Sequence, residues 1–425
     1  MANTQYIMDN ALFACLRRQI PLFAQSALAF SLLLLSASLL QARQAEDASP
    51  RGQETIGDTL AFNESSNIIF LDSGSFRLDG QTIEIASLDS ATQVVMRMKR
   101  RDAANVEYNK GLAYIEEAKP DMAIAPLSQA ILLHSDFASA YANRGVAYMQ
   151  LEEMDEALQD FEKALEVDPT LHTAYFNRAR IYDKQGEAKK AILDYSKTLA
   201  VYPQYAPGYY YRGVLAFKAE SYSECIEDFL KAVQYDPDYA LAHHDLGSAK
   251  RMLGNIVGAE QAYTSAIEAN PKLGIAYNNR GSMRVRLGKY REAINDFSEA
   301  IRLEGDNPIY FNNRGNARFE SEDYEGAVRD FDQALALKDD YAYAYNNRAT
   351  AKIKLDDYKG AIADCTEALK LDKEQPLVYL NRGVAYEMAR KPEKACEDWR
   401  VAAELGSKAA SIYLREDCLE RYGIK

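Results

Sequence analysis

Few side chains in this sequence could do chemistry, and they do not gather into a catalytic pattern. Only four histidines occur, and of these His243 and His244 stand next to Asp245. This trio could suggest a metal site, but side chains one residue apart on a helix point in different directions. Because the sequence also has no glycine-rich phosphate loop and no nucleophile motif, it predicts no metal, no other cofactor and no enzyme activity.

Cysteine spacing gives no sign of a metal site or a disulfide framework. The five cysteines are Cys15, Cys225, Cys365, Cys396 and Cys418. They form no CxxC pair and no Cys/His cluster at zinc spacing. The cysteines therefore leave the redox compartment open.

Composition limits the classes of partner. The formal net charge is -13, which argues against a nucleic acid as the main partner, since that binding depends on an excess of Lys and Arg. Tyrosine is abundant, with 29 residues against 12 prolines, which suits a well-packed helical protein better than a disordered one.

One amide position recurs through most of the chain. The position occurs nine times. Seven of its residues are asparagines, Asn109, Asn143, Asn177, Asn279, Asn313, Asn347 and Asn381, and the other two are Tyr211 and Asp245. An amide side chain both donates and accepts hydrogen bonds, so a row of amides can bind the main chain of an extended polypeptide of any sequence. The alternative is that these amides satisfy local backbone groups or water.

A 34-residue repeat positions these side chains. A small residue recurs at this interval, as Gly111, Gly145, Ala179, Gly213, Gly247, Gly281, Gly315, Ala349 and Gly383. Counting from Ala104 as position 1, nine repeats fill residues 104–409. Each has two helical patterns, with small residues at positions 8, 20 and 27 and a large residue at position 24. This pattern predicts two antiparallel helices that approach closely, with large side chains opposite small ones.

The pattern resembles the tetratricopeptide repeat family over about three quarters of the chain. The resemblance implies an all-α fold, a right-handed superhelical α-solenoid of antiparallel helix pairs, with a protein- or peptide-binding role. It also implies that the first helix of each repeat lines a concave surface. The asparagines at position 6 are similar to the amide ladder in the arm of O-linked N-acetylglucosamine transferase. Residues 410–425 should form a C-terminal capping helix, as solenoid ends require.

The resemblance places the candidate binding residues on this concave face. The predicted peptide-binding residues are Asn143, Asn177, Asn279, Asn313, Asn347, Asn381, Tyr210, Tyr211, His244, Lys184, Lys218, Arg251 and Arg286. Aromatic side chains near Tyr211, such as Phe176, could form a pocket for an anchoring side chain or could simply pack. The basic residues would favour an acidic peptide, although solvated helix faces often have the same composition.

Positions 7 and 23 change together. Arg and Asp occupy them in seven repeats, and the fifth repeat replaces both, with Leu246 and Ala262. If the turn between the two helices centres near position 15, these positions face each other and the arginine can contact the carboxylate with two hydrogen bonds. The paired loss favours this structural interpretation over an arginine stripe that binds a ligand.

The N-terminal part predicts a membrane or export segment. No charged residue occurs between Arg18 and Arg43, and residues 20–41 are long and apolar enough to span a bilayer. Arg17 and Arg18 predict a cytoplasmic N-terminal region over residues 1–19 and an external remainder. The same features describe a cleaved signal peptide. A buried helix of a soluble protein is a third interpretation.

Residues 42–103 predict a linker. Short β-prone runs at 67–71, 75–78 and 82–86 indicate a small hairpin or meander, and a basic helical segment leads into the repeats.

The sequence therefore favours a bacterial cell-envelope scaffold that grips extended polypeptide. It would be anchored in the inner membrane with its repeats in the periplasm, or exported if the N-terminal segment is cleaved. One alternative is a structural organiser that oligomerises and leaves its groove unused. Another is a docking arm for a small module at residues 52–103. The partner and the oligomeric state stay open.

Overall fold

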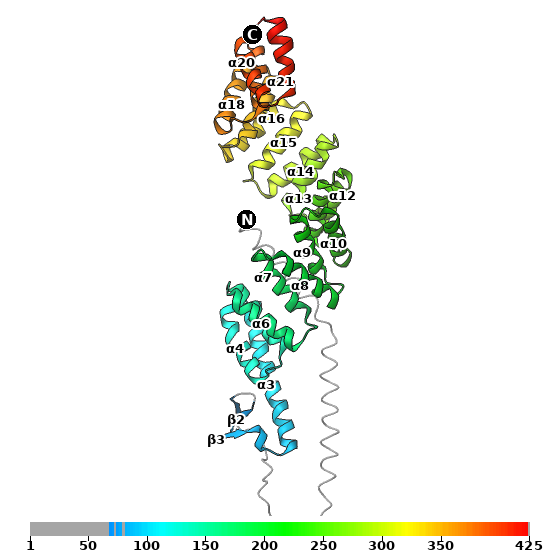
Figure 1. The fold of residues 1–425 in the computed structure, drawn as a ribbon, viewed down its shortest axis with the longest axis vertical. Coiled ribbons are helices and arrows are strands. Elements are labelled where there is room, and N and C mark those ends of the chain that lie inside the picture. Colours follow the sequence, from blue (N-terminus) through cyan, green and yellow to red (C-terminus); the bar gives the residue numbers. More distant parts are fainter. Residues whose placement is uncertain (1–67, 72–73, 79–80, 424–425) are drawn as a thin grey trace, which may run out of the picture. The chain divides into compact units, whose positions relative to one another are not determined.

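The computed structural model describes residues 68–71, 74–78 and 81–423 (Figure 1). The predicted N-terminal region 1–19 and the predicted membrane or signal segment 20–41 lie outside these residues. Within the described part, no helix combines the length and the apolar content that a bilayer crossing needs.

A small antiparallel meander precedes the helices. Its strands are β1 (Ile68–Phe70), β2 (Ser75–Leu78) and β3 (Gln81–Glu84), in the order β1-β2-β3, and they are followed by the short 3-10 helix η1 (Ile85–Ser87). Phe76 of β2 is fully buried and packs with Ile85 and with Met96 of the first long helix. The β-prone runs therefore form a small sheet that packs against the start of that helix.

The first helix begins earlier than the repeat pattern predicts. Helix α3 (Ser90–Glu116) extends through the basic segment before Ala104. The side chain of Asp89 caps it by accepting hydrogen bonds from the backbone N–H groups of Ala91 and Thr92, each at 3.0 Å. The last part of the predicted linker, residues 90–103, is therefore part of the first helical hairpin.

Every repeat contributes a first helix, here called the A helix, and a second, the B helix. After α3 the A helices are α5 (Ala138–Gln150), α7 (His172–Lys184), α9 (Ala206–Lys218), α11 (Ala240–Met252), α13 (Gly274–Arg286), α15 (Pro308–Glu320), α17 (Ala342–Lys354) and α19 (Pro376–Met388). The B helices are α4 (Pro120–Leu133), α6 (Met154–Val167), α8 (Ala188–Val201), α10 (Tyr222–Tyr235), α12 (Ile256–Ala269), α14 (Tyr290–Leu303), α16 (Tyr324–Leu337), α18 (Tyr358–Leu371) and α20 (Pro392–Glu404). This order is that of an all-α solenoid of paired helices.

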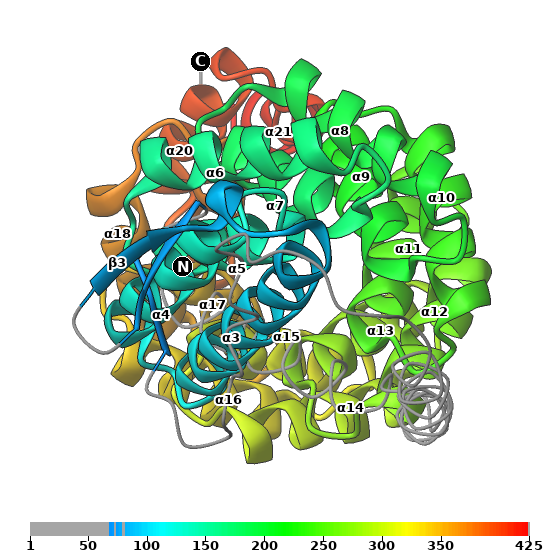
Figure 2. The same cartoon turned by 90° about the horizontal axis from the view of Figure 1, so that it is seen from below.

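The A helices lie on the inner side of the stacked pairs. The chain divides into two compact units between Ala174 and Tyr175. In the second unit α9 contacts α11, and each of α13, α15 and α17 contacts the next A helix. Figure 2 shows α9, α11 and α13 on the inner side of α10, α12 and α14. We call the exposed surface of the A helices, formed by positions 2, 6, 9 and 13, the inner face.

Small residues at position 8 allow the A and B helices to approach, as the sequence predicts. A Cβ atom added to Gly315 would lie 2.6 Å from the ring of Phe331, and one added to Gly281 would lie 2.9 Å from the ring of Phe297. Since carbon atoms pack at about 3.5–4.0 Å, an alanine at either place would push the ring away.

The turn between the helices of a repeat is centred on position 15. The backbone adopts positive φ there at Gly186, Gly254 and Gly288, and also at Ala118, Glu152, Glu220, Glu322, Asp356 and Arg390. This geometry places positions 7 and 23 opposite each other across each hairpin.

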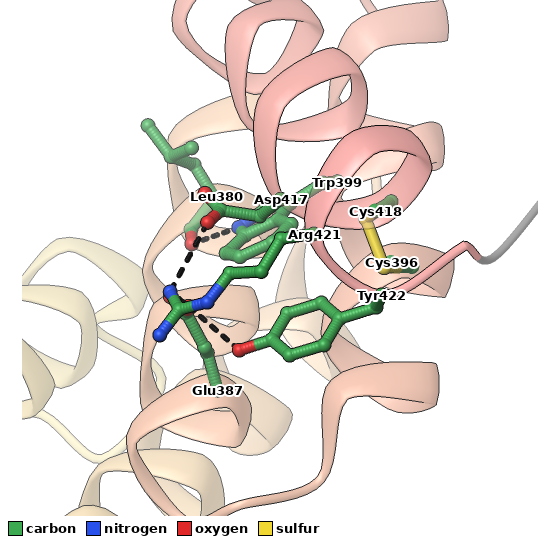
Figure 3. Close-up of a disulfide and its surroundings, with 8 residues drawn as sticks. All are labelled: Leu380, Glu387, Cys396, Trp399, Asp417, Cys418, Arg421 and Tyr422. Carbon is green, nitrogen blue, oxygen red and sulfur yellow. Dashed lines mark hydrogen bonds and ion pairs between the residues drawn. A yellow bond between two sulfur atoms is a disulfide. The ribbon is translucent and has the colours of Figure 1, made fainter.

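The chain ends in a short helix α21 (Lys408–Tyr413) and a π-helical segment η2 (Leu414–Arg421). A disulfide joins Cys396 of α20 to Cys418 of η2, with a Cα–Cα distance of 5.8 Å (Figure 3). The interpretation that the cysteines imply no disulfide is wrong here, because residues 22 apart in sequence become neighbours only when η2 folds back on α20. The predicted capping helix is thus covalently fixed to the last repeat.

Candidate functional site

Seven arginines at position 7 bind the aspartates at position 23 of their own repeats. The pairs are Arg144–Asp160, Arg178–Asp194, Arg212–Asp228, Arg280–Asp296, Arg314–Asp330, Arg348–Asp364 and Arg382–Asp398, each with two N–O distances of 2.6–3.0 Å. The hydrogen bond to Asp398 raises the pKa of Arg382 above its ordinary value. The predicted pairing is confirmed, and these arginines are committed to holding the two helices of a repeat together.

Three of the aspartates bind a second cation that the sequence interpretation missed. Arg284, Arg318 and Lys352 occupy position 11 of consecutive A helices. They contact Asp296, Asp330 and Asp364 at 2.8, 2.9 and 2.8 Å. The signal was present in the sequence, because position 11 is basic in these repeats and tyrosine or alanine in several others.

The asparagines at position 6 link neighbouring repeats. The Nδ2 atoms of Asn313, Asn347 and Asn381 donate to the Oδ1 atoms of the buried asparagines one repeat earlier, at position 5. These acceptors are Asn278, Asn312 and Asn346, and the distances are 2.9, 3.0 and 2.9 Å. We call Asn313, Asn347 and Asn381 the asparagine row.

The Oδ1 atoms of the asparagine row have no hydrogen-bond donor among the residues that the structure describes. Each Nδ2 also carries a second N–H group, because an amide nitrogen has two. These hydrogen bonds hold the half-buried row in place on α15, α17 and α19, and Asn381 adds a second one from Nδ2 to Oγ1 of Thr350 at 3.3 Å. The Oδ1 atoms of the row are therefore acceptors that the described residues leave unused.

The other predicted asparagines differ in their partners. Asn143 donates to the hydroxyl of Tyr108 at 2.8 Å and to the carbonyl oxygen of Ser139 at 3.0 Å. Asn177 is half-buried on α7. The regular amide row is thus a feature of α15 to α19.

A hydrogen-bonded chain replaces the amides where the row is interrupted. Tyr210 donates to one oxygen of Asp245 at 3.0 Å, and Nδ1 of His244 lies 2.8 Å from the other. Nδ2 of Asn279 lies 2.9 Å from Nε2 of His244. Since an amide nitrogen only donates, Nε2 accepts and Nδ1 carries the proton. Burial raises the pKa of Tyr210, so its hydroxyl stays protonated as the donor.

The predicted aromatic pocket is not formed by Phe176 and Tyr210. Both are buried, at 1% and 3% exposure, and they pack in the core of the solenoid. Tyr211 is half-buried, stacks on Tyr195 and lies below the guanidinium of Arg180 at 5.9 Å. The prediction of an anchoring pocket is wrong for the two buried rings because the small residues beside them let the helices close over them.

The four predicted basic residues lie exposed near the C-terminal ends of their A helices. Lys184, Lys218, Arg251 and Arg286 belong to α7, α9, α11 and α13. Nζ of Lys218 contacts Asp183 of the preceding repeat at 3.0 Å.

No cluster of His, Cys, Asp and Glu suited to a metal ion occurs in the described parts of the chain. The ring of His243 turns toward the carbonyl oxygen of Pro237, at 2.9 Å, while His244 bonds Asp245.

Family models match most of the helical hairpins. Models described as tetratricopeptide repeat match residues 138–171, 161–192, 210–273 and 342–375, and one described as TPR repeat matches 281–321 and 315–356. The chain contains tetratricopeptide repeats. Repeats of this kind generally form scaffolds that bind proteins or peptides.

Several solved structures are similar to this chain at low sequence identity. The C-terminal part of a tetratricopeptide repeat protein from Cytophaga hutchinsonii is 21% identical, with 56% of this chain and 99% of that chain covered and a TM-score of 0.46. The Cut9–Hcn1 complex of the APC/C is 18% identical, with 74% of this chain and 76% of that chain covered and a TM-score of 0.45. Yeast Tom70 is 14% identical, with 76% of this chain and 98% of that chain covered and a TM-score of 0.37. A comparison with curated protein sequences gives no match.

Proposed function

We propose that this tetratricopeptide repeat protein is a cell-envelope scaffold that grips an extended polypeptide along its inner face. The observation that carries the proposal is the asparagine row, Asn313, Asn347 and Asn381. Its amide oxygens stand on consecutive A helices with their orientation fixed by the preceding repeat. Such a row can bind main-chain N–H groups without reading side chains.

The arginines at position 7 also support the proposal, because they are already paired within their own repeats. Because each arginine at position 7 is bound to an aspartate, recognition on the inner face falls to the amides and to the exposed residues at positions 2, 9 and 13. Exposed basic residues favour acidic side chains in the part of the polypeptide that lies over α7 to α13: Lys184, Lys218 and Arg286 at position 13, and Arg251 beside them at position 12.

Two features support a location outside the cytoplasm. The Cys396–Cys418 disulfide is of a kind that persists in oxidising compartments and is rare in the cytosol. The uncharged apolar stretch of residues 20–41 is suited to anchoring or exporting the chain. We therefore place the repeats on the outer side of the inner membrane.

The test uses a partner captured by crosslinking in native cell envelopes and then purified. Its affinity for the repeats is measured by titration calorimetry for the parent protein and for Asn313→Ala with Asn347→Ala. We expect the double variant to weaken binding about tenfold or more, since two main-chain hydrogen bonds are lost. The control is Lys163→Ala on the exposed surface of α6, which should bind normally.

Full affinity of the asparagine variant, with thermal melting unchanged, would contradict binding through the row. Binding by the parent should also weaken as salt increases, because the basic inner-face residues contribute through screened charge interactions. Salt-independent binding would remove those residues from the site.

A further inference from the structure

An exposed apolar side chain stands at position 2 of each A helix in the last part of the solenoid. These side chains are Ile275, Ile309, Tyr343 and Leu377, with exposed fractions of 36%, 48%, 65% and 56%. We call them the apolar row. In three earlier repeats position 2 is polar or proline, with Ser139, Thr173 and Pro207. Position 2 of α11 is Leu241, which is half-buried, so the exposed apolar row belongs to α13, α15, α17 and α19.

The apolar row runs beside the asparagine row. Residues four apart on a helix lie on one face, so Ile309 neighbours Asn313 and Tyr343 neighbours Asn347. A segment lying along the inner face can therefore reach main-chain acceptors and apolar side chains together.

Acidic residues border the apolar row at the N-terminal ends of the A helices. The loops that precede α15, α17 and α19 carry two exposed lysines, Lys338 and Lys373, against six exposed acidic residues, Glu304, Asp306, Asp339, Asp340, Asp372 and Glu374. The position of Glu304 shows how these side chains reach the helix ends, because a Cβ added to Gly274, the first residue of α13, would lie 2.6 Å from its carboxylate oxygen. A ligand on the apolar row therefore meets negative charge along that side.

The spacing of the row suits one backbone conformation. The hydrogen bonds of 2.9–3.0 Å between positions 5 and 6 of successive repeats hold these A helices in contact. Packed helices lie about 8–10 Å apart. A polyproline II segment advances about 3.1 Å per residue, so every third side chain falls on one face about 9 Å from the last.

The same conformation matches the amide acceptors. A polyproline II backbone makes no internal hydrogen bonds, so its N–H groups are available to partners. The Oδ1 atoms of the asparagine row accept no bond from the described residues, and the row occupies position 6 of this surface. In an α-helical ligand, by contrast, most N–H groups already donate hydrogen bonds within the helix.

We infer that the C-terminal inner face, from α13 to α19, binds a polyproline II segment with an apolar side chain at every third residue and Lys or Arg between them. This inference rests on the proposed function and adds the sequence pattern of the partner. The apolar side chains contact the apolar row, the cationic residues approach the acidic loops, and the main-chain N–H groups donate to the asparagine row.

The experiment uses the full chain and two fluorescent peptides of identical composition. One repeats Leu-Lys-Pro four times, and the other contains the same residues with the leucines placed at irregular intervals. Fluorescence anisotropy should show at least about tenfold tighter binding of the regular peptide. Equal affinity for the two peptides, or no binding of either at up to about millimolar protein, would overturn the inference.

Variants separate this inference from the proposed function. Ile309→Ser with Tyr343→Ser should abolish the preference for the regular peptide. The matched control is Leu193→Ser on the B helix α8, where the leucine is 56% exposed and should not matter. If the serine variant keeps the preference, the inference fails. If Asn313→Ala with Asn347→Ala still weakens binding of the purified partner in that case, the proposed function stands. If the serine variant keeps the peptide preference and the asparagine variant keeps full affinity for the partner, both the inference and the proposed function are rejected.

Discussion

At the residue scale, the arginine–aspartate pairs do not all have the same surroundings. Asp398 has Arg382 as its cationic partner, whereas Asp296 binds both Arg280 and Arg284. A buried carboxylate that keeps one cation is much less costly than one that loses its only cation. The two repeats therefore separate the effect of an unpaired charge from the effect of a lost side chain.

We predict that Arg382→Leu lowers the free energy of unfolding by about 3–5 kcal/mol, because it leaves Asp398 buried without a counter-ion. Arg382→Leu with Asp398→Leu should recover most of that loss. Arg280→Leu should cost clearly less than Arg382→Leu, because Arg284 still neutralises Asp296. Urea unfolding followed by circular dichroism measures all three. Equal losses in the single and double variants would contradict the pairing.

At the element scale, close approach of the A and B helices depends on the missing Cβ at position 8. Two repeats have alanine there: Ala349 has the small Cys365 opposite it, whereas Ala179 packs in one cluster with the large Tyr195. Where the opposite residue is a phenylalanine, the ring fills the space over the glycine.

Gly315→Ala should destabilise the protein by about 1–3 kcal/mol, because the added methyl group overlaps the ring of Phe331 and forces the helices apart. The gain in helix propensity from replacing glycine, about 1 kcal/mol, is included in that net loss. Asn316→Ala, the next residue on the same helix, is the control and should stay near the parent value. Thermal unfolding decides, and a stabilised Gly315→Ala protein would refute close packing at this position.

The C-terminal cap is the other element with a direct test. Cys396 and Cys418 join α20 to η2, and Glu387 of α19 accepts hydrogen bonds from Arg421 and Tyr422 (Figure 3). The ring of Tyr413 also stacks on that of Trp399, with 4.7 Å between the ring centroids. These contacts cover the last hairpin of the array, which no further repeat follows among the described residues.

Cys396→Ser with Cys418→Ser should lower stability by about 3 kcal/mol, the usual effect of opening a loop of this size. Reductant should lower the melting temperature of the parent and leave the double variant unchanged. Burial raises the pKa of the Cys225 thiol to about 11 and that of the Cys365 thiol to about 12. Because alkylation requires the thiolate, these two thiols should react slowly and serve as a reference for the alkylation of Cys418. Rapid alkylation of Cys418 in freshly isolated native protein would show that the disulfide is absent.

At the scale of the whole molecule, buried tyrosines connect stability to pH. Burial raises the pKa of Tyr195, Tyr210, Tyr239, Tyr263 and Tyr310 above the ordinary value near 10. The folded chain therefore keeps these protons at pH values where the unfolded chain loses them. Their contribution to stability is complete below pH 10 and is lost as the pH rises above it.

We expect the melting temperature to fall steeply between about pH 10 and 12, with the buried tyrosines ionising only as the chain unfolds. Absorbance at 295 nm, recorded with circular dichroism at each pH, follows both events. Tyr195→Phe removes one buried hydroxyl that has no hydrogen-bond partner among the described residues, and it should flatten the pH dependence slightly. Ionisation of all tyrosines before any loss of helix would contradict this account.

Contacts inside one repeat could be predicted from the sequence, whereas contacts between repeats could not. The arginine and aspartate that pair in seven repeats are both replaced in the fifth, by Leu246 and Ala262. The glycine that stands at Gly315 also recurs with a large residue sixteen positions later, so repetition itself reveals these pairs. The bond from Asn347 to Asn312 crosses the boundary at a separation of 35 residues, and only the stacking of the hairpins brings these amides together.

Features that occur once carried no repeated signal. The Cys396–Cys418 disulfide depends on the π-helical turn of η2, and the early start of α3 depends on the cap at Asp89 and on packing of Met96 under the meander. The burial of Tyr210, which sequence reasoning assigned to the binding face, follows from the packing of its ring against Phe229 and Tyr239.

The most direct test of polypeptide binding on the inner face is site-specific photo-crosslinking in living cells. A benzophenone amino acid replaces either Glu320 of the A helix α15, at position 13, or Arg329 of the adjoining B helix α16, both of which are exposed. The account predicts that the probe at Glu320 forms adducts with another polypeptide, that Asn313→Ala with Asn347→Ala removes them, and that the probe at Arg329 forms none. Adducts from Arg329 that survive the asparagine substitutions, with none from Glu320, would contradict it.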